Sequence, residues 1–273
     1  MNIVGLGQCG CNIAKCFDQY PQYKVYLFDS EERKHKNFRL LKKQSSHKGY
    51  EENFPKFRFK PKYDETIFFC ASSGKITGAS LCLLHHFKET QIRCVLIIPS
   101  EDEMPAIYEE QHKLIFNALQ DYARSGVFKD IVFILNESLE NSIPDLTFFN
   151  KYDKINEVLC YMFHMFNVFE NTEPISKTKF FSKEHCRILS VGSYDYKKNK
   201  ENMYFSLDNE NESCYYISIP RKVLETDTKL IRTIKNNFKE KENYSYQIYS
   251  NNLEYNVGFV VKRTHFNQGQ NFS

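Results

Sequence analysis

Short apolar segments alternate with helix-like segments through the first half of the chain. The strand-like segments are 2–7, 23–30, 65–74, 92–100 and 130–138, and the helix-like segments are 11–20, 79–89 and 105–125. These strands are apolar throughout, a pattern typical of strands whose two faces are both covered by helices. The first half therefore predicts a doubly wound α/β domain with a parallel sheet, and the polar, basic stretch 31–62 is interpreted as a loop with one short helix.

Residues 147–171 follow a different pattern. Apolar side chains recur there at steps of three and four: Phe148, Tyr152, Ile155, Val158, Leu159, Met162, Phe166 and Phe169. This spacing predicts one amphipathic helix with the apolar stripe in the core, ended by Pro174. About 25 residues at 1.5 Å each give a rod of roughly 37 Å.

Strand-like segments dominate after Pro174, with one helix at about 227–238. This predicts a smaller α+β domain with a mixed or antiparallel sheet. The predicted boundaries are 1–146 for the α/β domain, 147–172 for the central helix, 173–266 for the C-terminal domain and 267–273 for a flexible tail.

Composition narrows the class of protein. The 273 residues are 41% hydrophobic and 26% charged, which is ordinary for a globular chain, and the net charge of +3 gives no argument for a nucleic-acid or membrane partner. The nine cysteines lie mostly in apolar runs and lack metal-ligand spacing, so we expect reduced thiols and no metal site. No apolar run approaches the ~20 residues of a membrane span and no signal peptide precedes the first strand, so we expect a cytoplasmic protein.

A glycine-rich loop follows the first predicted strand. Gly5, Gly7 and Gly10 form G-x-G-x-x-G between a strand and a helix starting near Cys11, the fingerprint of dinucleotide binding. Asp29 ends the second strand, where an acid would bind a ribose hydroxyl, so an NAD-dependent oxidoreductase is one interpretation. A plain strand-to-helix turn is another.

A second loop, ASSGKITGAS at 71–80, follows the third predicted strand and leads into another helix. It offers further backbone N–H groups to an anion, and two such loops favour a triphosphate held from both sides. It is not a Walker loop, because no Ser or Thr follows Lys75 and Phe69 stands at the first glycine position.

These motifs together resemble the tubulin/FtsZ superfamily over most of the chain. The first loop contains the tubulin-type Gly7-Gln8-Cys9-Gly10 and an FtsZ-type Asn12, and the second aligns with the signature G-G-G-T-G-[ST]-G, retaining Gly74, Thr77 and Gly78. FILNES at 133–138 and KINEVL at 154–159 resemble the segment before the ribose-side loop and the start of the central helix. The C-terminal domain has the family's order of strands and helix.

The resemblance implies that the chain binds GTP or GDP, with Mg²⁺ as a candidate ion. Amides of Gln8, Cys9 and Gly10 would face the α- and β-phosphates. The segment from Gly74 to Ala79 would hold the β- and γ-phosphates, with Lys75 and Thr77 as side-chain donors. Asn156 would pair with guanine, the alternative being an exposed helix residue, and Glu101 or Glu103 would approach the ribose unless they lie in a solvated loop.

The chain departs from the family where hydrolysis occurs. The family's loop after the central helix has the pattern N-x-D-x-x-[DE], and here Lys177, Lys179 and Ser182 occupy its three defining positions. Lysine at neutral pH cannot accept a proton from water, so no catalytic residue is assigned and hydrolysis is expected to be slow or absent. In the second loop, Ile76 replaces a small residue and is expected to crowd the site.

Two functions follow. The first is a small, divergent filament-forming protein of the kind found on plasmids and in bacteriophages, stacking head to tail and working with a DNA-bound adaptor to position DNA or phage. The second is a pseudo-GTPase that retains the fold as an interaction or adaptor protein.

Overall fold

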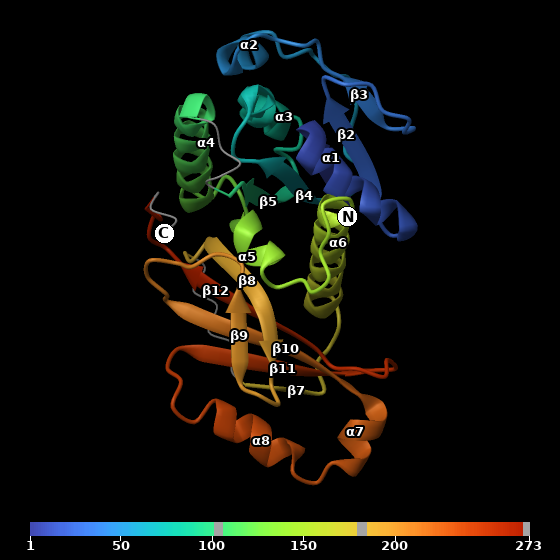
Figure 1. Cartoon of the computed structure of the whole chain (residues 1–273), viewed down its shortest axis with the longest axis vertical. Coiled ribbons are helices and arrows are strands. Elements are labelled where there is room, and N and C mark those ends of the chain that lie inside the picture. Colours follow the sequence, from blue (N-terminus) through green and yellow to red (C-terminus); the bar gives the residue numbers. More distant parts are fainter. Residues whose placement is uncertain (101–105, 179–184, 270–273) are drawn as a thin grey trace.

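The computed structural model describes residues 1–100, 106–178 and 185–269, and within them one twelve-stranded sheet forms the spine of the molecule (Figure 1). The first six strands are β1 (Asn2–Leu6), β2 (Lys24–Asp29), β3 (Phe38–Leu40), β4 (Glu65–Ala71), β5 (Gln91–Ile98) and β6 (Asp130–Leu135). The others are β7 (Ser176–Lys177), β8 (Ile188–Asp195), β9 (Lys200–Met203), β10 (Glu212–Pro220), β11 (Tyr244–Asn251) and β12 (Val257–Thr264). Their order is β3-β2-β1-β4-β5-β6-β8-β12-β10-β11-β7, with β9 paired to β8.

The predicted doubly wound architecture is confirmed in the first half. In the run β3-β2-β1-β4-β5-β6, each strand is parallel to its neighbours. Strands β1, β4 and β5 are buried almost throughout. The helices there are α1 (Gly7–Cys16), α2 (His47–Glu52), α3 (Ser80–His85), α4 (Ala106–Arg124), α5 (Asn136–Glu140) and α6 (Lys151–Glu170). One core packs α1 and α6 against one face of the sheet, and a second packs α3 and α4 against the other.

The central helix is shorter than its hydrophobic pattern predicts. Helix α6 begins at Lys151, because Thr147 and Asn150 form a turn in which the Thr147 amide donates to Asn150 Oδ1 at 2.7 Å. Phe148 therefore precedes the helix and is fully exposed, and Tyr152 is 56% exposed, so assigning these two to the core stripe was wrong. The rest of the stripe is buried or half-buried as predicted.

The second half continues the same sheet. Strand β8 runs parallel to β6 and antiparallel to β12, β12 is antiparallel to β10, and β10 is parallel to β11, which makes the predicted mixed sheet. Helices α7 (Arg221–Thr226) and α8 (Leu230–Asn237) follow β10, and α7 was not predicted. Figure 1 shows them at the end of the molecule opposite α2 and β3.

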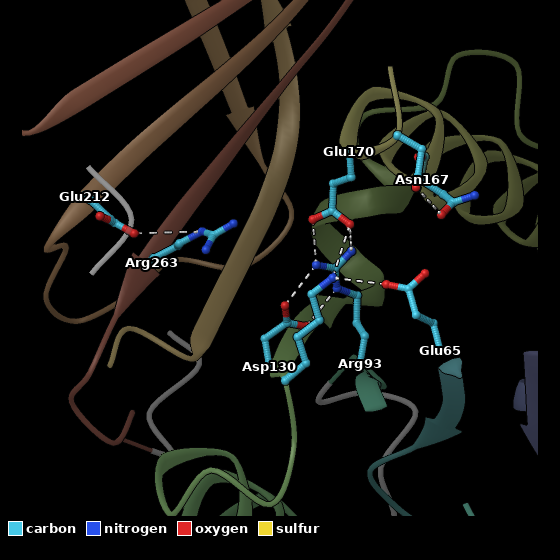
Figure 2. A network of polar contacts seen from close by, with 9 residues as sticks. Glu65, Arg93, Asp130, Asn167, Glu170, Glu212 and Arg263 are labelled. Carbon is cyan, nitrogen blue, oxygen red and sulfur yellow. Dashed lines mark hydrogen bonds and ion pairs between the residues drawn. The ribbon is translucent and has the colours of Figure 1, made fainter. Parts of the chain in front are cut away.

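A buried ion network ties the end of α6 to the sheet (Figure 2). Arg93 on β5 is 4% exposed and donates to both carboxylate oxygens of Asp130 on β6 at 2.7 and 2.9 Å. The same guanidinium donates to Glu170, the last residue of α6, at 2.9 and 3.2 Å. Lys129 lies 3.5 Å from Glu170, and the guanidinium stacks 4.5 Å from the ring centre of Phe166. This network joins β5, β6 and α6 at the end of α6 distant from Asn156.

Candidate functional site

A cavity of about 590 Å³ lies where β1, β4 and β5 end, in the size range of small-molecule sites. The carboxyl ends of parallel strands meet at one edge of a sheet, which brings the first and second loops together there. Seven of the predicted site residues line this cavity: Gly7, Gln8, Cys9, Asn12, Gly74, Thr77 and Asn156. The two loops thus face one shared space.

The first loop is the start of a helix. Helix α1 begins at Gly7, directly after β1, rather than near Cys11 as predicted. The first amides of an α-helix have no acceptor within the helix, and no side chain caps this end, since the N-cap residue is Leu6. The amides of Gly7, Gln8 and Cys9 are therefore donors at the positive end of a helix dipole, an arrangement suited to phosphate.

Two glycines of the first loop have distinct roles. Gly7 has φ +69°, a left-handed conformation that favours glycine. Gly10 does not line the cavity, and a Cβ there would overlap the carbonyl oxygen of Phe69 on β4. Gly10 is thus required for the close packing of α1 on the sheet.

Cys9 contributes a neutral thiol to the cavity. Burial raises the pKa of Cys9 to about 12. The group therefore carries no negative charge at neutral pH and does not repel an anion.

The second loop is a 3₁₀ turn, η2 (Lys75–Ala79), that leads into the short helix α3. Gly74 has φ +104°, and the Thr77 hydroxyl donates to the Gly74 carbonyl at 2.7 Å. Thr77 thus closes the turn with the hydroxyl that was predicted to bind phosphate. Of the other predicted phosphate contacts, Lys75 is exposed and does not line the cavity.

Gly78 and Ala79 are packing residues in this structure. A Cβ on Gly78 would overlap the carbonyl oxygen of His47 on α2, and Ala79 is fully buried in the core beneath. Neither lines the cavity. The close approach of α2 explains why position 78 is a glycine.

Ile76 lines the same cavity, as the sequence led us to expect. Its Cγ2 lies 2.8 Å from the position that a Cβ on Gly7 would take, so the two loops touch through this side chain. Ile76 narrows the space between the loops without closing it.

Gly7→Ala is expected to lower the free energy of unfolding by about 2 kcal/mol or more, from left-handed strain plus overlap with Ile76. In an Ile76→Ala background the same change should cost about 1–2 kcal/mol, because only the strain is left. Urea denaturation of the four proteins measures both costs. Equal costs in the two backgrounds would show that the loops are not in contact here.

Residues of α6 and α5 also line the cavity. Asn156 is 8% exposed and faces the cavity, so the alternative of an exposed helix residue is wrong. Tyr152, one helical turn earlier, lines the same wall and offers an aromatic face. Asn136 at the start of α5 also lines the cavity, and its buried Oδ1 accepts no hydrogen bond among the described residues.

Sequence reasoning missed Tyr152 and Asn136 as site residues. The signals were present: Tyr152 stands four residues before Asn156, a spacing that puts both on one helix face. Asn136 directly follows a buried parallel strand, where ligand-facing residues gather.

A polar chain supports Asn12 from outside the cavity. Arg33 donates from Nη1 to Asn12 Oδ1 at 2.7 Å and from Nε to Asp29 Oδ2 at 2.8 Å. Because a guanidinium only donates, Asn12 turns its oxygen to Arg33 and keeps its NH₂ group for another acceptor. Asp29 also accepts from the Ser30 amide and does not line the cavity, which argues against the ribose role that the NAD interpretation gave it.

Four predicted residues lie outside the described residues: Glu101, Glu103, Lys179 and Ser182. Lys177 is described, on the two-residue strand β7, where it is exposed and lies 3.7 Å from Glu173.

Within the described ranges, no group of three His, Cys, Asp or Glu side chains is arranged to hold a metal ion. No helix in that part of the chain is both long and apolar enough to cross a membrane.

Comparisons with known proteins identify the fold. No family model matches the chain, and no curated protein matches it. Solved structures do match, and they show that the chain has the fold of the tubulin/FtsZ superfamily.

Three of these structures illustrate the likeness. A GTPγS-form protofilament of TubZ from Bacillus thuringiensis serovar israelensis superposes with a TM-score of 0.69 at 12% identity, covering 96% of this chain and 86% of that one. An FtsZ mutant from M. jannaschii gives 0.66 at 14% identity, with 96% and 90% covered. GDP-bound CetZ1 from Haloferax volcanii gives 0.62 at 11% identity, with 99% and 94% covered.

Proposed function

We propose that the cavity binds a guanine nucleotide, GTP or GDP. The observation that carries this proposal is the shared cavity, which is lined by the uncapped start of α1, by the η2 turn and by Asn156 on α6. The α1 amides would bind phosphate, the Tyr152 ring would stack on the base, and Asn156 would pair with its edge. Mg²⁺ is proposed to bind mainly through the phosphates, as this ion commonly does.

The orphaned Oδ1 of Asn136 supports a polar ligand at this site. A buried acceptor without a partner costs free energy, and a ribose hydroxyl or an amino group of a base would satisfy it. We assign Asn136 to the nucleoside end of the cavity, since α5 packs against α6, which carries Asn156.

Asn156→Leu is expected to weaken GTP binding by about 10- to 100-fold, because the polar edge of the base would be left unpaired (about 1–3 kcal/mol). Isothermal titration with GTP, GDP and ATP measures the loss and the base preference. Asn236→Leu, an exposed change on α8, is the matched control and should bind like the unmodified chain. Equal affinity of GTP and ATP for the unmodified chain would remove Asn156 as the base-reading residue.

We further propose that copies of the chain stack head to tail into filaments that hydrolyse GTP slowly or not at all. The TubZ structure with this fold is a protofilament, which supports self-association. Slow turnover rests on Lys179 and Ser182, which stand at the positions where acids would activate water, and on Lys177 at the asparagine position, 3.7 Å from Glu173. Positioning of DNA or phage particles is the cellular role within this proposal, and GTP-dependent pelleting with phosphate release tests its first two parts.

A pseudo-GTPase is the second candidate, and two observations favour it. Ile76 occupies space between the loops, and the Thr77 hydroxyl is already used inside its own turn. In this case chromatography of ligand released from freshly purified protein would show no guanine nucleotide, and titration at millimolar GTP would show no heat.

A further inference from the structure

The stretch 31–62 holds the charge asymmetry of the chain. It contains eleven Lys and Arg against four Asp and Glu, a net charge of +7. The whole chain carries +3, so all other residues together carry −4. The small net charge of the chain therefore conceals one strongly basic region.

Ten of the eleven cations are exposed, and Arg33 is the one that is half-buried. The exposed ones are Lys34, Lys36, Arg39, Lys42, Lys43, Lys48, Lys56, Arg58, Lys60 and Lys62. Among the described residues, Lys48 is the one of these ten with a carboxylate within 4 Å, that of Glu52 at 3.4 Å. A merely solvated surface is normally of mixed sign, whereas 33–43 and 53–63 contain cations and no acid.

Aromatic packing fixes the conformation of residues 54–61, which carry three of these cations. Residues 54–61 form no strand, yet their exposure alternates: Lys56, Arg58 and Lys60 point outward, while Phe57 and Phe59 are half-buried between them. The rings of Phe57 and Phe59 lie 5.4 and 6.1 Å from that of Phe28 on β2. The segment that carries Lys56, Arg58 and Lys60 is therefore held in place by a contact with the hydrophobic core.

The two acid-free basic runs, 33–43 and 53–63, lie next to each other in the structure. Phe28 is paired in register with Arg39 on the edge strand β3, and the 57–59 segment packs on that same Phe28. Figure 1 shows β3 and α2 at the end of the molecule farthest from α7 and α8. The two runs therefore lie next to each other at β2 and β3, and we call them together the basic surface.

We propose that this basic surface binds the phosphate backbone of duplex nucleic acid without reading its sequence. Alternate residues of an extended segment are about 6.6 Å apart, and each strand of a duplex carries one phosphate per ~3.4 Å of helix axis, so a row of cations at this spacing suits the dense row of phosphates. Single-strand binding needs aromatic rings free for base stacking, and the rings of Phe54, Phe57 and Phe59 pack inward. A membrane surface is disfavoured because Leu40 is the one large apolar side chain exposed in this stretch.

The test uses the full chain, a fluorescent 30-base-pair duplex of arbitrary sequence, and anisotropy titrations between 50 and 200 mM NaCl. The unmodified chain should bind with a steep salt dependence. In K56Q/R58Q/K60Q the slope of log K against log [salt] should fall by about 3, since three phosphate contacts are lost, and affinity at 100 mM salt should fall at least about tenfold. The matched control K229Q/R232Q/K235Q removes the same charge from exposed positions on and beside α8 and should bind like the unmodified chain.

Several results would overturn the proposal. These are no duplex binding at 50 mM salt, an equal loss in the two triple variants, or tighter binding to a single strand of the same length. Binding to phosphatidylserine vesicles with no binding to the duplex would assign the surface to a membrane instead. Circular dichroism of both variants checks that the fold is intact, and because no guanine nucleotide is added, the outcome is independent of the proposed nucleotide site.

Discussion

Arg93→Met is expected to lower the free energy of unfolding by about 3–5 kcal/mol, because it leaves carboxylates buried without their cation. Asp130 is 4% exposed, and the side chain of Glu170 is 21% exposed; both accept two hydrogen bonds from Arg93. Methionine retains most of the packing against Phe166 and supplies no donor. Chemical denaturation at pH 7 measures the loss.

The matched control is Arg221→Met on α7. Arg221 forms a similar short ion pair, with Glu225 at 2.8 Å, but both side chains are exposed to solvent, so its loss should have little effect on the free energy of unfolding. Similar losses in the two variants would mean that burial does not strengthen the Arg93 network. Arg93→Lys should fall between them, because an ammonium retains the charge without the bidentate geometry.

The same network predicts how the fold responds to acid. Burial by itself would raise the pKa of Glu170, but the charge and hydrogen bonds of Arg93, with help from Lys129, outweigh it and lower that pKa from 4.5 to about 2. A carboxylate with a lowered folded-state pKa stabilises the fold fully above its unfolded pKa and loses that contribution as pH falls through the folded one. The unmodified chain should therefore lose about 3 kcal/mol from this group between roughly pH 5 and pH 2.

Glu170→Gln should flatten this part of the stability curve, at the cost of lower stability at pH 7. Glu201 is a second acid with a pKa near 2: burial opposes the shift, and Lys241, Tyr215 and Lys262 outweigh it. Glu201→Gln should remove a separate share of the acid sensitivity. Exposed Glu225→Gln is the control, and urea titrations from pH 2.5 to 7 compare the four proteins. An unchanged pH slope in Glu170→Gln would show that Arg93 does not hold this carboxylate ionised.

The Arg93 network also connects the stability of the fold to the proposed function. Helix α6 carries Tyr152 and Asn156 near its start and Glu170 at its end, and Arg93 fixes that end to β5 and β6. Strand β5 and helix α5, which follows β6, also reach the cavity, through Ile97 and Asn136. Loss of the Arg93 network should therefore loosen the position of the proposed base-binding wall relative to the loops.

Much of the fold could be predicted from local patterns. Segments such as 94–98 are apolar at every position, which is the pattern of a parallel strand between two helical layers, and β5 has that environment. The paired loops were also predictable, because glycines after buried strands mark the edge where parallel strands end. The hydrophobic periodicity wrongly placed Phe148 in the core stripe. A hydrogen bond between the Thr147 amide and Asn150 forms a turn just before α6, and such a bond cannot be predicted from the spacing of apolar residues.

The sequence by itself determined the α/β class, the order of the elements and the strand ends that carry the loops, because periodicity and glycine placement act over a few residues. Only the tertiary structure decided which loop residues face the cavity: Gly74 lines it, while Gly10 and Gly78 leave room for backbone from other elements. It also paired Arg93 with Glu170, 77 residues apart, and joined two basic runs over β2. Such contacts depend on how elements pack, and packing depends on the whole chain.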